Sequence, residues 1–183
     1  GKSALGRELR KLLDVPCRET DEQVEALYRH GHPGESKGCR EIFDALGEEG
    51  FRRLEEEAVR SLDDMDWGIL VTGGSTFASA VNRQALRRNA VVIHCRCPRD
   101  VLKRRVEGQL AGTAGMNKAV YLKWFAEDAE LKDELYAKFA DIVIATDAAP
   151  PEALAAEARE RLGQELAVRT TAANTFGELV RQN

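Results

Sequence analysis

Residues 67–74, WGILVTGG, combine a short apolar run with two consecutive glycines. The run is too short for a helix and has the continuous apolar character of a strand that is buried on both faces. Two similar runs follow it, AVVIHC at 90–95 and DIVIAT at 141–146. Amphipathic helical patterns alternate with these runs, so the sequence predicts one α/β domain with a parallel sheet covered on both faces.

The composition is that of a globular protein and limits the classes of partner. Of the 183 residues, 43% are hydrophobic and 32% are charged, and the net charge is −4. This acidic balance argues against nucleic acid and anionic membranes, which bind basic surfaces. No apolar run approaches the ~20 residues that cross a bilayer, and no signal peptide precedes the first predicted helix. The four cysteines lack the spacing of a zinc set, which favours free, buried or half-buried thiols in a reducing cytoplasm.

The first three residues, GKS, open a predicted helix over residues 2–13. They match the last three positions of the phosphate-binding loop G-x-x-x-x-G-K-[ST]. The free N–H groups and the dipole of a helix N-terminus attract an anion. In that loop the lysine reaches the β- and γ-phosphates and the serine hydroxyl can ligate Mg²⁺. Because three residues are a short match, an ordinary N-terminal helix remains the alternative.

Three further segments could carry chemistry. Glu19 and Asp21 lie where a second strand would end, and carboxylates at that edge of a parallel sheet point into the ligand crevice. Asp21 could equally be a plain helix cap. Arg52 and Glu55 lie three residues apart on one helical face, for which a solvated ion pair is the usual explanation. The glycines at 73–74 let backbone approach a ligand closely, although a tight turn is the alternative.

Taken together, these motifs resemble the shikimate kinase family from residue 1 to about residue 160. The resemblance rests on GKS-x-x-G-R, a carboxylate-Thr-Asp, EIFDALGEEGFRRLEEE at 41–57, VTGGS at 71–75 and N-R-x-x-L. It implies a P-loop kinase fold, an α/β/α arrangement around a parallel sheet whose first, central strand would precede residue 1. We therefore expect a phosphate loop truncated in this chain, with a gap or unpaired strand edges where that strand belongs. The kinase domain is expected over 1–166, with a tail at 167–183.

The resemblance also implies the chemistry and the residues of the site. The implied reaction is ATP-dependent phosphorylation of a hydroxyl of shikimate, with Mg²⁺, by a cytoplasmic monomer. The residues implied to bind ATP are Gly1, Lys2, Ser3 and Arg105, the last against adenine beside the loop TDAAP at 146–150. Those implied to support the metal are Ser3 and Glu19. Those implied to bind the substrate are Asp21, Arg52, Gly73, Gly74 and Lys132, while Lys2 and Asp21 are implied to be catalytic.

The chain departs from the family pattern at several of these positions. Glu19 replaces an aspartate, Ser75 replaces the third glycine of a GGG run, and Lys132 replaces an arginine. Gly112 stands where the family lid has an arginine, which leaves Lys118 as the nearby cation. A lysine offers a point charge where an arginine offers a bidentate fork. Three functions therefore stay open: a shikimate kinase, a related kinase for another small hydroxy acid, and a non-catalytic homologue that binds a nucleotide or a partner protein.

Overall fold

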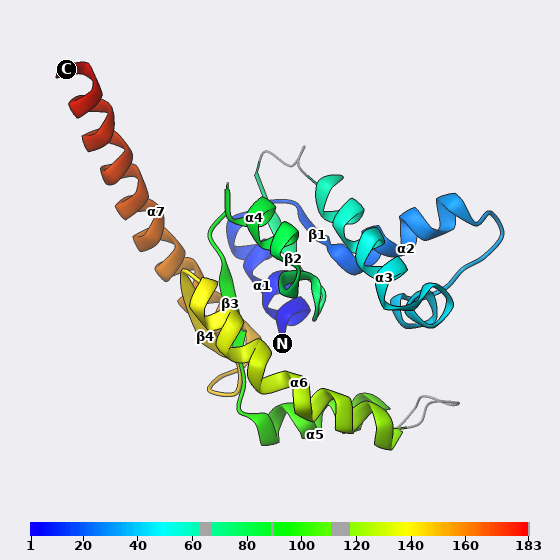
Figure 1. The fold of residues 1–183 in the computed structure, drawn as a ribbon. Coiled ribbons are helices and arrows are strands. Elements are labelled where there is room, and N and C mark those ends of the chain that lie inside the picture. The colour runs from blue at the N-terminus through cyan, green and yellow to red at the C-terminus, as the bar shows by residue number, and fades with distance from the viewer. Residues whose placement is uncertain (63–66, 89, 111–117, 183) are drawn as a thin grey trace. The chain divides into compact units, whose positions relative to one another are not determined.

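The computed structural model describes residues 1–62, 67–88, 90–110 and 118–182 (Figure 1). The chain divides into two compact units, residues 1–90 and 91–183. Each unit contains one two-stranded parallel sheet. None of the described helices is both long enough and apolar enough to cross a membrane.

The first unit is built around a short parallel sheet. Its elements are α1 (Lys2–Leu13), β1 (Cys17–Glu19), α2 (Thr20–Gly31), α3 (Cys39–Arg60), β2 (Ile69–Val71), η1 (Thr76–Ala78) and α4 (Ala80–Arg88). In the sheet Cys17 lies opposite Ile69 and Glu19 lies opposite Val71. Because parallel strands run in the same direction, residues after Glu19 and after Val71 leave the sheet at the same edge.

Helix α1 packs closely on this sheet because its sequence places a glycine on the inner face. Leu5, Gly6 and Leu9 are buried. A Cβ added to Gly6 would lie 2.5 Å from Cγ2 of Val71, which is closer than two carbon atoms can pack. The absent side chain therefore sets the spacing between the helix and β2.

A second part of the core lies between α2 and α3. It consists of Val24, Tyr28, Ile42, Phe51 and Ala58. Helix α3 is interrupted at Gly47, whose φ of 69° and ψ of 178° favour glycine. The interruption divides α3 into two helical segments that meet at this glycine.

The second unit has the same strand–helix alternation. Its elements are β3 (Ile93–Arg96), α5 (Arg99–Leu110), α6 (Lys118–Phe139), β4 (Ile142–Ala145) and α7 (Pro151–Gln182). In its sheet Ile93 lies opposite Ile142 and Arg96 lies opposite Ala145. Its buried residues include Ile142, Ile144, Leu154, Ala155 and Ala158, so α7 covers β4 with its small side chains.

The three apolar runs of the sequence all form strands, and every pairing is parallel, as predicted. The hydrogen bonds join residues 69–71 to 17–19 and residues 93–96 to 142–145. The described strands form two separate two-stranded sheets with unpaired edges, so the single sheet predicted from the sequence is not formed by the hydrogen bonds of the described residues. Residues 167–182 continue α7 as a helix, and the division into a kinase domain and a tail stays a prediction. Thr170 and Thr171 donate their hydroxyls to the carbonyls of residues four positions earlier, which accommodates both within the helix.

Candidate functional site

Thr20 joins the two segments that leave the first sheet at its carboxyl edge. It is fully buried, and its Oγ1 accepts a hydrogen bond of 2.7 Å from the backbone N–H of Gly73. The same Oγ1 lies 3.3 Å from Oγ1 of Thr76, which is also buried. The start of α2 and the turn after β2 are therefore fixed to each other, together with the candidate site residues that they carry.

The two residues expected to support a metal lie together. Ser3, in the first turn of α1, donates its hydroxyl to Oε2 of Glu19 over 3.3 Å. Lys2 and Gly1 are exposed at the N-terminal end of the same helix. The first turn of α1 thus combines backbone N–H groups, a lysine and a serine hydroxyl, a set that suits a phosphate group.

Asp21 lies in the first turn of α2 and not at its cap, because the helix begins at Thr20 with Glu19 as the N-cap residue. The prediction of an Asp21 cap was therefore wrong, since Thr20 is already helical and its hydroxyl is bonded to Gly73. Desolvation raises the pKa of Asp21. The positive charge of Lys2 lowers this pKa, whereas the negative charges of Glu55 and Glu19 raise it further. The lysine and both carboxylates therefore lie close enough to Asp21 to change its pKa.

Gly73 provides space for Asp21. A Cβ added to Gly73 would collide with Oδ1 of Asp21 and would lie 2.9 Å from Oγ1 of Thr76. Its N–H, expected to be offered to a substrate, instead donates to Thr20 in this structure. Gly74 is exposed, and a Cβ added there would meet nothing within 4 Å.

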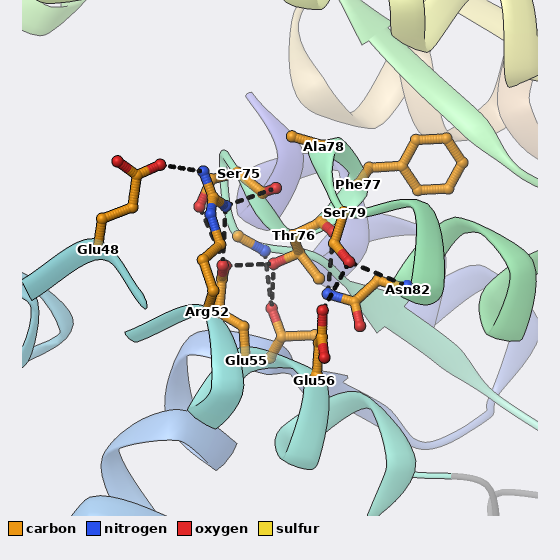
Figure 2. Close-up of polar contacts among 12 residues, drawn as sticks. Glu48, Arg52, Glu55, Glu56, Ser75, Thr76, Phe77, Ala78, Ser79 and Asn82 are labelled. Carbon is orange, nitrogen blue, oxygen red and sulfur yellow. Dashed lines mark hydrogen bonds and ion pairs between the residues drawn. The ribbon is translucent and has the colours of Figure 1, made fainter. Parts of the chain in front are cut away.

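Arg52 and Glu55 form a part-buried ion pair on α3 (Figure 2). Nη1 of Arg52 lies 3.1 Å from Oε2 of Glu55, whose side chain is only 2% exposed. Nη1 also donates to the carbonyl of Ser75 over 3.3 Å, and Nη2 lies 3.7 Å from the exposed carboxylate of Glu48. The solvated ion pair considered from spacing alone is therefore wrong for the buried Glu55.

Glu55 also receives hydrogen bonds from the turn after β2. Its Oε1 accepts bonds of 3.0 Å from Oγ of Ser75 and 3.0 Å from Oγ1 of Thr76 (Figure 2). The roles of Thr20 and Thr76 were not predicted from the sequence. The available signal was that each threonine comes shortly after a predicted strand end, where side chains of a parallel sheet gather.

In the second unit, Arg105 lies against the segment expected to contact adenine. Its Nη2 donates to the backbone carbonyl of Thr146 over 2.9 Å, and its Nη1 donates to Oγ1 of Thr146 over 3.4 Å. Nη1 also lies 3.5 Å from Sγ of Cys97. Because Thr146 begins the TDAAP segment, the structure brings together the two features that were predicted to form an adenine site.

The remaining predicted site residues also belong to the second unit. Lys132 is half-buried on α6, and Lys118 begins that helix. Gly112 lies outside the described residues. The assignments of Lys132 to the substrate and of Gly112 and Lys118 to a lid therefore stay predictions.

Comparisons with known proteins agree with this arrangement. The family model described as shikimate kinase matches residues 1–163. A shikimate kinase of Pseudomonas syringae pv. tomato is 32% identical over 170 residues, which cover 90% of this chain and 91% of that protein. A Pseudomonas putida shikimate kinase is 33% identical with the same coverage.

Solved structures show the same fold at lower identity. A shikimate kinase from Bacteroides thetaiotaomicron gives a TM-score of 0.73 at 22% identity and covers 89% of this chain and 92% of that one. A shikimate kinase from Acinetobacter baumannii in complex with shikimate gives a TM-score of 0.73 at 24% identity, covering 90% of this chain and 87% of that one. The likeness extends over nearly the whole chain and establishes a P-loop kinase type of α/β fold.

Proposed function

Because the chain belongs to the shikimate kinase family, we propose that it transfers the terminal phosphoryl group of ATP to a hydroxyl of shikimate. The observation that carries this proposal is the pair of fixed, opposite charges on the first unit. Buried Glu55 holds the guanidinium of Arg52, and Asp21 lies beside Gly73 at the sheet edge. A cation and a carboxylate held in this way match a small acid that carries hydroxyl groups.

Each charge has a distinct task in this proposal. The planar guanidinium of Arg52 suits the substrate carboxylate, because its N–H groups match carboxylate oxygens in pairs. Asp21 accepts a hydrogen bond from the hydroxyl that attacks the phosphorus and takes up its proton. The raised pKa of Asp21 makes its carboxylate a stronger base than an ordinary aspartate, which favours that transfer.

Each unit is assigned one part of the nucleotide, and each assignment stands by itself. Lys2 and the first-turn N–H groups of α1 bind the phosphates, and Arg105 with Thr146 borders the adenine. Ser3 and Glu19 place two oxygen donors 3.3 Å apart, which fits Mg²⁺, an ion that usually takes few protein ligands besides phosphates and waters. When bound, the ion supplies positive charge to the phosphate oxygens. The residues of this chain hold and orient the groups that react.

A second candidate function is a kinase for a different small hydroxy acid. It is favoured by Lys132, which stands where the family has an arginine and offers a point charge instead of a fork. We further propose a cytoplasmic monomer with no nucleic-acid partner. The net charge of −4 argues against a nucleic-acid partner, and four half-buried cysteines outside any disulfide support a reducing compartment.

The test is the release of ADP coupled to shikimate, followed by a panel of other hydroxy acids. Arg52→Ala is expected to raise the KM for shikimate at least about tenfold, because removing one member of a buried charge pair usually costs about 2–5 kcal/mol. The KM for ATP should stay within about twofold. Arg53→Ala is the matched control, since Arg53 forms only an exposed pair with Glu49 on the same helix.

The outcomes separate the candidates. Turnover with shikimate supports the first function, and turnover only with another acid supports the second. No turnover with any acid would favour a non-catalytic homologue. An unchanged KM for shikimate in Arg52→Ala would remove Arg52 from the substrate site.

A further inference from the structure

Ser75 is the residue by which this chain departs from the glycine run of its family, and its side chain is bonded within the site. Its Oγ donates to Oε1 of Glu55 over 3.0 Å. Its backbone carbonyl accepts a 3.3 Å bond from Nη1 of Arg52. Ser75 therefore contacts both members of the ion pair, one through its side chain and the other through its backbone (Figure 2).

The hydroxyl of Ser75 fixes the rotation of the Glu55 carboxylate. Oε1 of Glu55 receives two donors, Ser75 and Thr76, which approach from the same turn. With Oε1 held by both, Oε2 is directed to Nη1 of Arg52. A glycine at position 75 would retain the carbonyl but would leave Oε1 with Thr76 as its side-chain donor from this turn.

The arrangement also decides which side of the guanidinium can meet a ligand. Nη1 carries two hydrogens, and its two acceptors are Oε2 of Glu55 and the carbonyl of Ser75. Nη2 instead lies 3.7 Å from Glu48, whose side chain is 73% exposed and can be displaced by another carboxylate. The Nη2 side of Arg52 is therefore the one presented to an incoming acid.

We propose that Ser75 is a positioning residue for Arg52. The hydroxyl of Ser75 holds Glu55 and its carbonyl accepts a hydrogen bond from Nη1 of Arg52, which directs the Nη2 side of the guanidinium to the substrate carboxylate. The part that concerns the substrate rests on the proposed function. The part that concerns the link between Ser75 and Arg52 belongs to the protein alone and can be measured without substrate.

The kinetic test compares Ser75→Ala with its parent. The φ of −113° at Ser75 suits alanine, so this substitution removes the hydroxyl without straining the backbone. We expect the KM for shikimate to rise about fivefold or more while kcat and the KM for ATP stay within about twofold. Ser75→Thr, which retains a hydroxyl, should restore the parental KM.

The matched control is Ser79→Ala. Ser79 donates to Oε1 of Glu56 over 3.0 Å, a serine–glutamate bond of the same length between the same two parts of the unit that involves neither Arg52 nor Glu55. It should leave the KM for shikimate unchanged. An equal rise in Ser79→Ala, or no rise in Ser75→Ala and Ser75→Gly, would overturn the proposal.

A double-mutant cycle in urea tests the link independently of turnover. Each single variant, Ser75→Ala and Arg52→Ala, should lower the equilibrium constant for folding by some factor. If Ser75 acts on Arg52, the double variant should lower this constant by less than the product of the two factors, and the difference should be at least about threefold. Losses that multiply within about twofold would overturn the link. If the parent protein fails to phosphorylate shikimate but the cycle shows coupling, the proposed function falls and the positioning role of Ser75 stands.

Discussion

Removing the carboxylate of Glu55 should unfold the site and weaken the whole first unit. This side chain is 2% exposed and accepts three hydrogen bonds, from Arg52, Ser75 and Thr76. In Glu55→Ala these donors lose their acceptor, and the guanidinium of Arg52 loses the charge that balances it. The perturbation therefore combines the loss of a part-buried ion pair with the loss of a buried side chain from α3.

The expected loss follows from these contacts. Breaking a buried pair by removing one partner costs about 3–5 kcal/mol. Glu55→Gln keeps the shape and one acceptor oxygen but loses the charge, and hydrogen bonds to a charged group contribute about 1.5–3 kcal/mol. A domain of this size typically has about 5–15 kcal/mol of stability, so the alanine variant should retain only a fraction of it.

The assay is equilibrium unfolding in urea, followed by circular dichroism. Glu49→Ala is the matched control, because Glu49 forms an ion pair with Arg53 on the same helix but both side chains are exposed. An exposed pair of this kind contributes about 0–1 kcal/mol. If Glu55→Ala costs no more than Glu49→Ala, Glu55 is not the buried centre of the network and the reasoning fails.

Two further predictions concern Asp21 and Arg105. Because desolvation raises the pKa of Asp21, its ionised form is less stable in the folded protein than in the unfolded chain. Asp21→Asn should therefore stabilise the protein at neutral pH. This gain in stability, measured by urea unfolding, should shrink as the pH falls through the raised pKa towards the ordinary aspartate range. A gain that does not depend on pH would contradict the assignment. Arg105→Ala should raise the KM for ATP about fivefold or more and leave the KM for shikimate within about twofold. The control Arg104→Ala removes an exposed ion pair with Asp100 and should change neither KM.

The strands and most helices could be predicted from the sequence because burial leaves a periodic pattern. The strands at 69–71 and 142–145 are apolar on both faces, as strands inside a covered sheet are, whereas the strand at 93–96 carries His94 and Arg96. The continuation of α7 to Gln182 was not predicted, because residues 167–172 are mostly exposed and an exposed stretch of helix needs no apolar periodicity.

The candidate site was predicted in part. The contact between Ser3 and Glu19 and the approach of Arg105 to Thr146 follow from motifs in which chemistry restricts the residue type. The burial of Glu55 could not be predicted, because the same i, i+3 spacing occurs in exposed ion pairs. The role of Thr20 could not be predicted either, because its hydroxyl oxygen accepts a hydrogen bond from a backbone amide 53 positions away in the sequence.

The close packing of α1 against β2 restricts how this sequence can vary. Gly6 and Val71 occupy one shared volume, with a hypothetical Cβ of the first lying 2.5 Å from Cγ2 of the second. A larger residue at position 6 would move α1, and with it Ser3, away from Glu19 unless position 71 became smaller at the same time. We therefore expect a larger residue at position 6 to be tolerated only together with a smaller one at position 71, although the two lie 65 positions apart in the sequence.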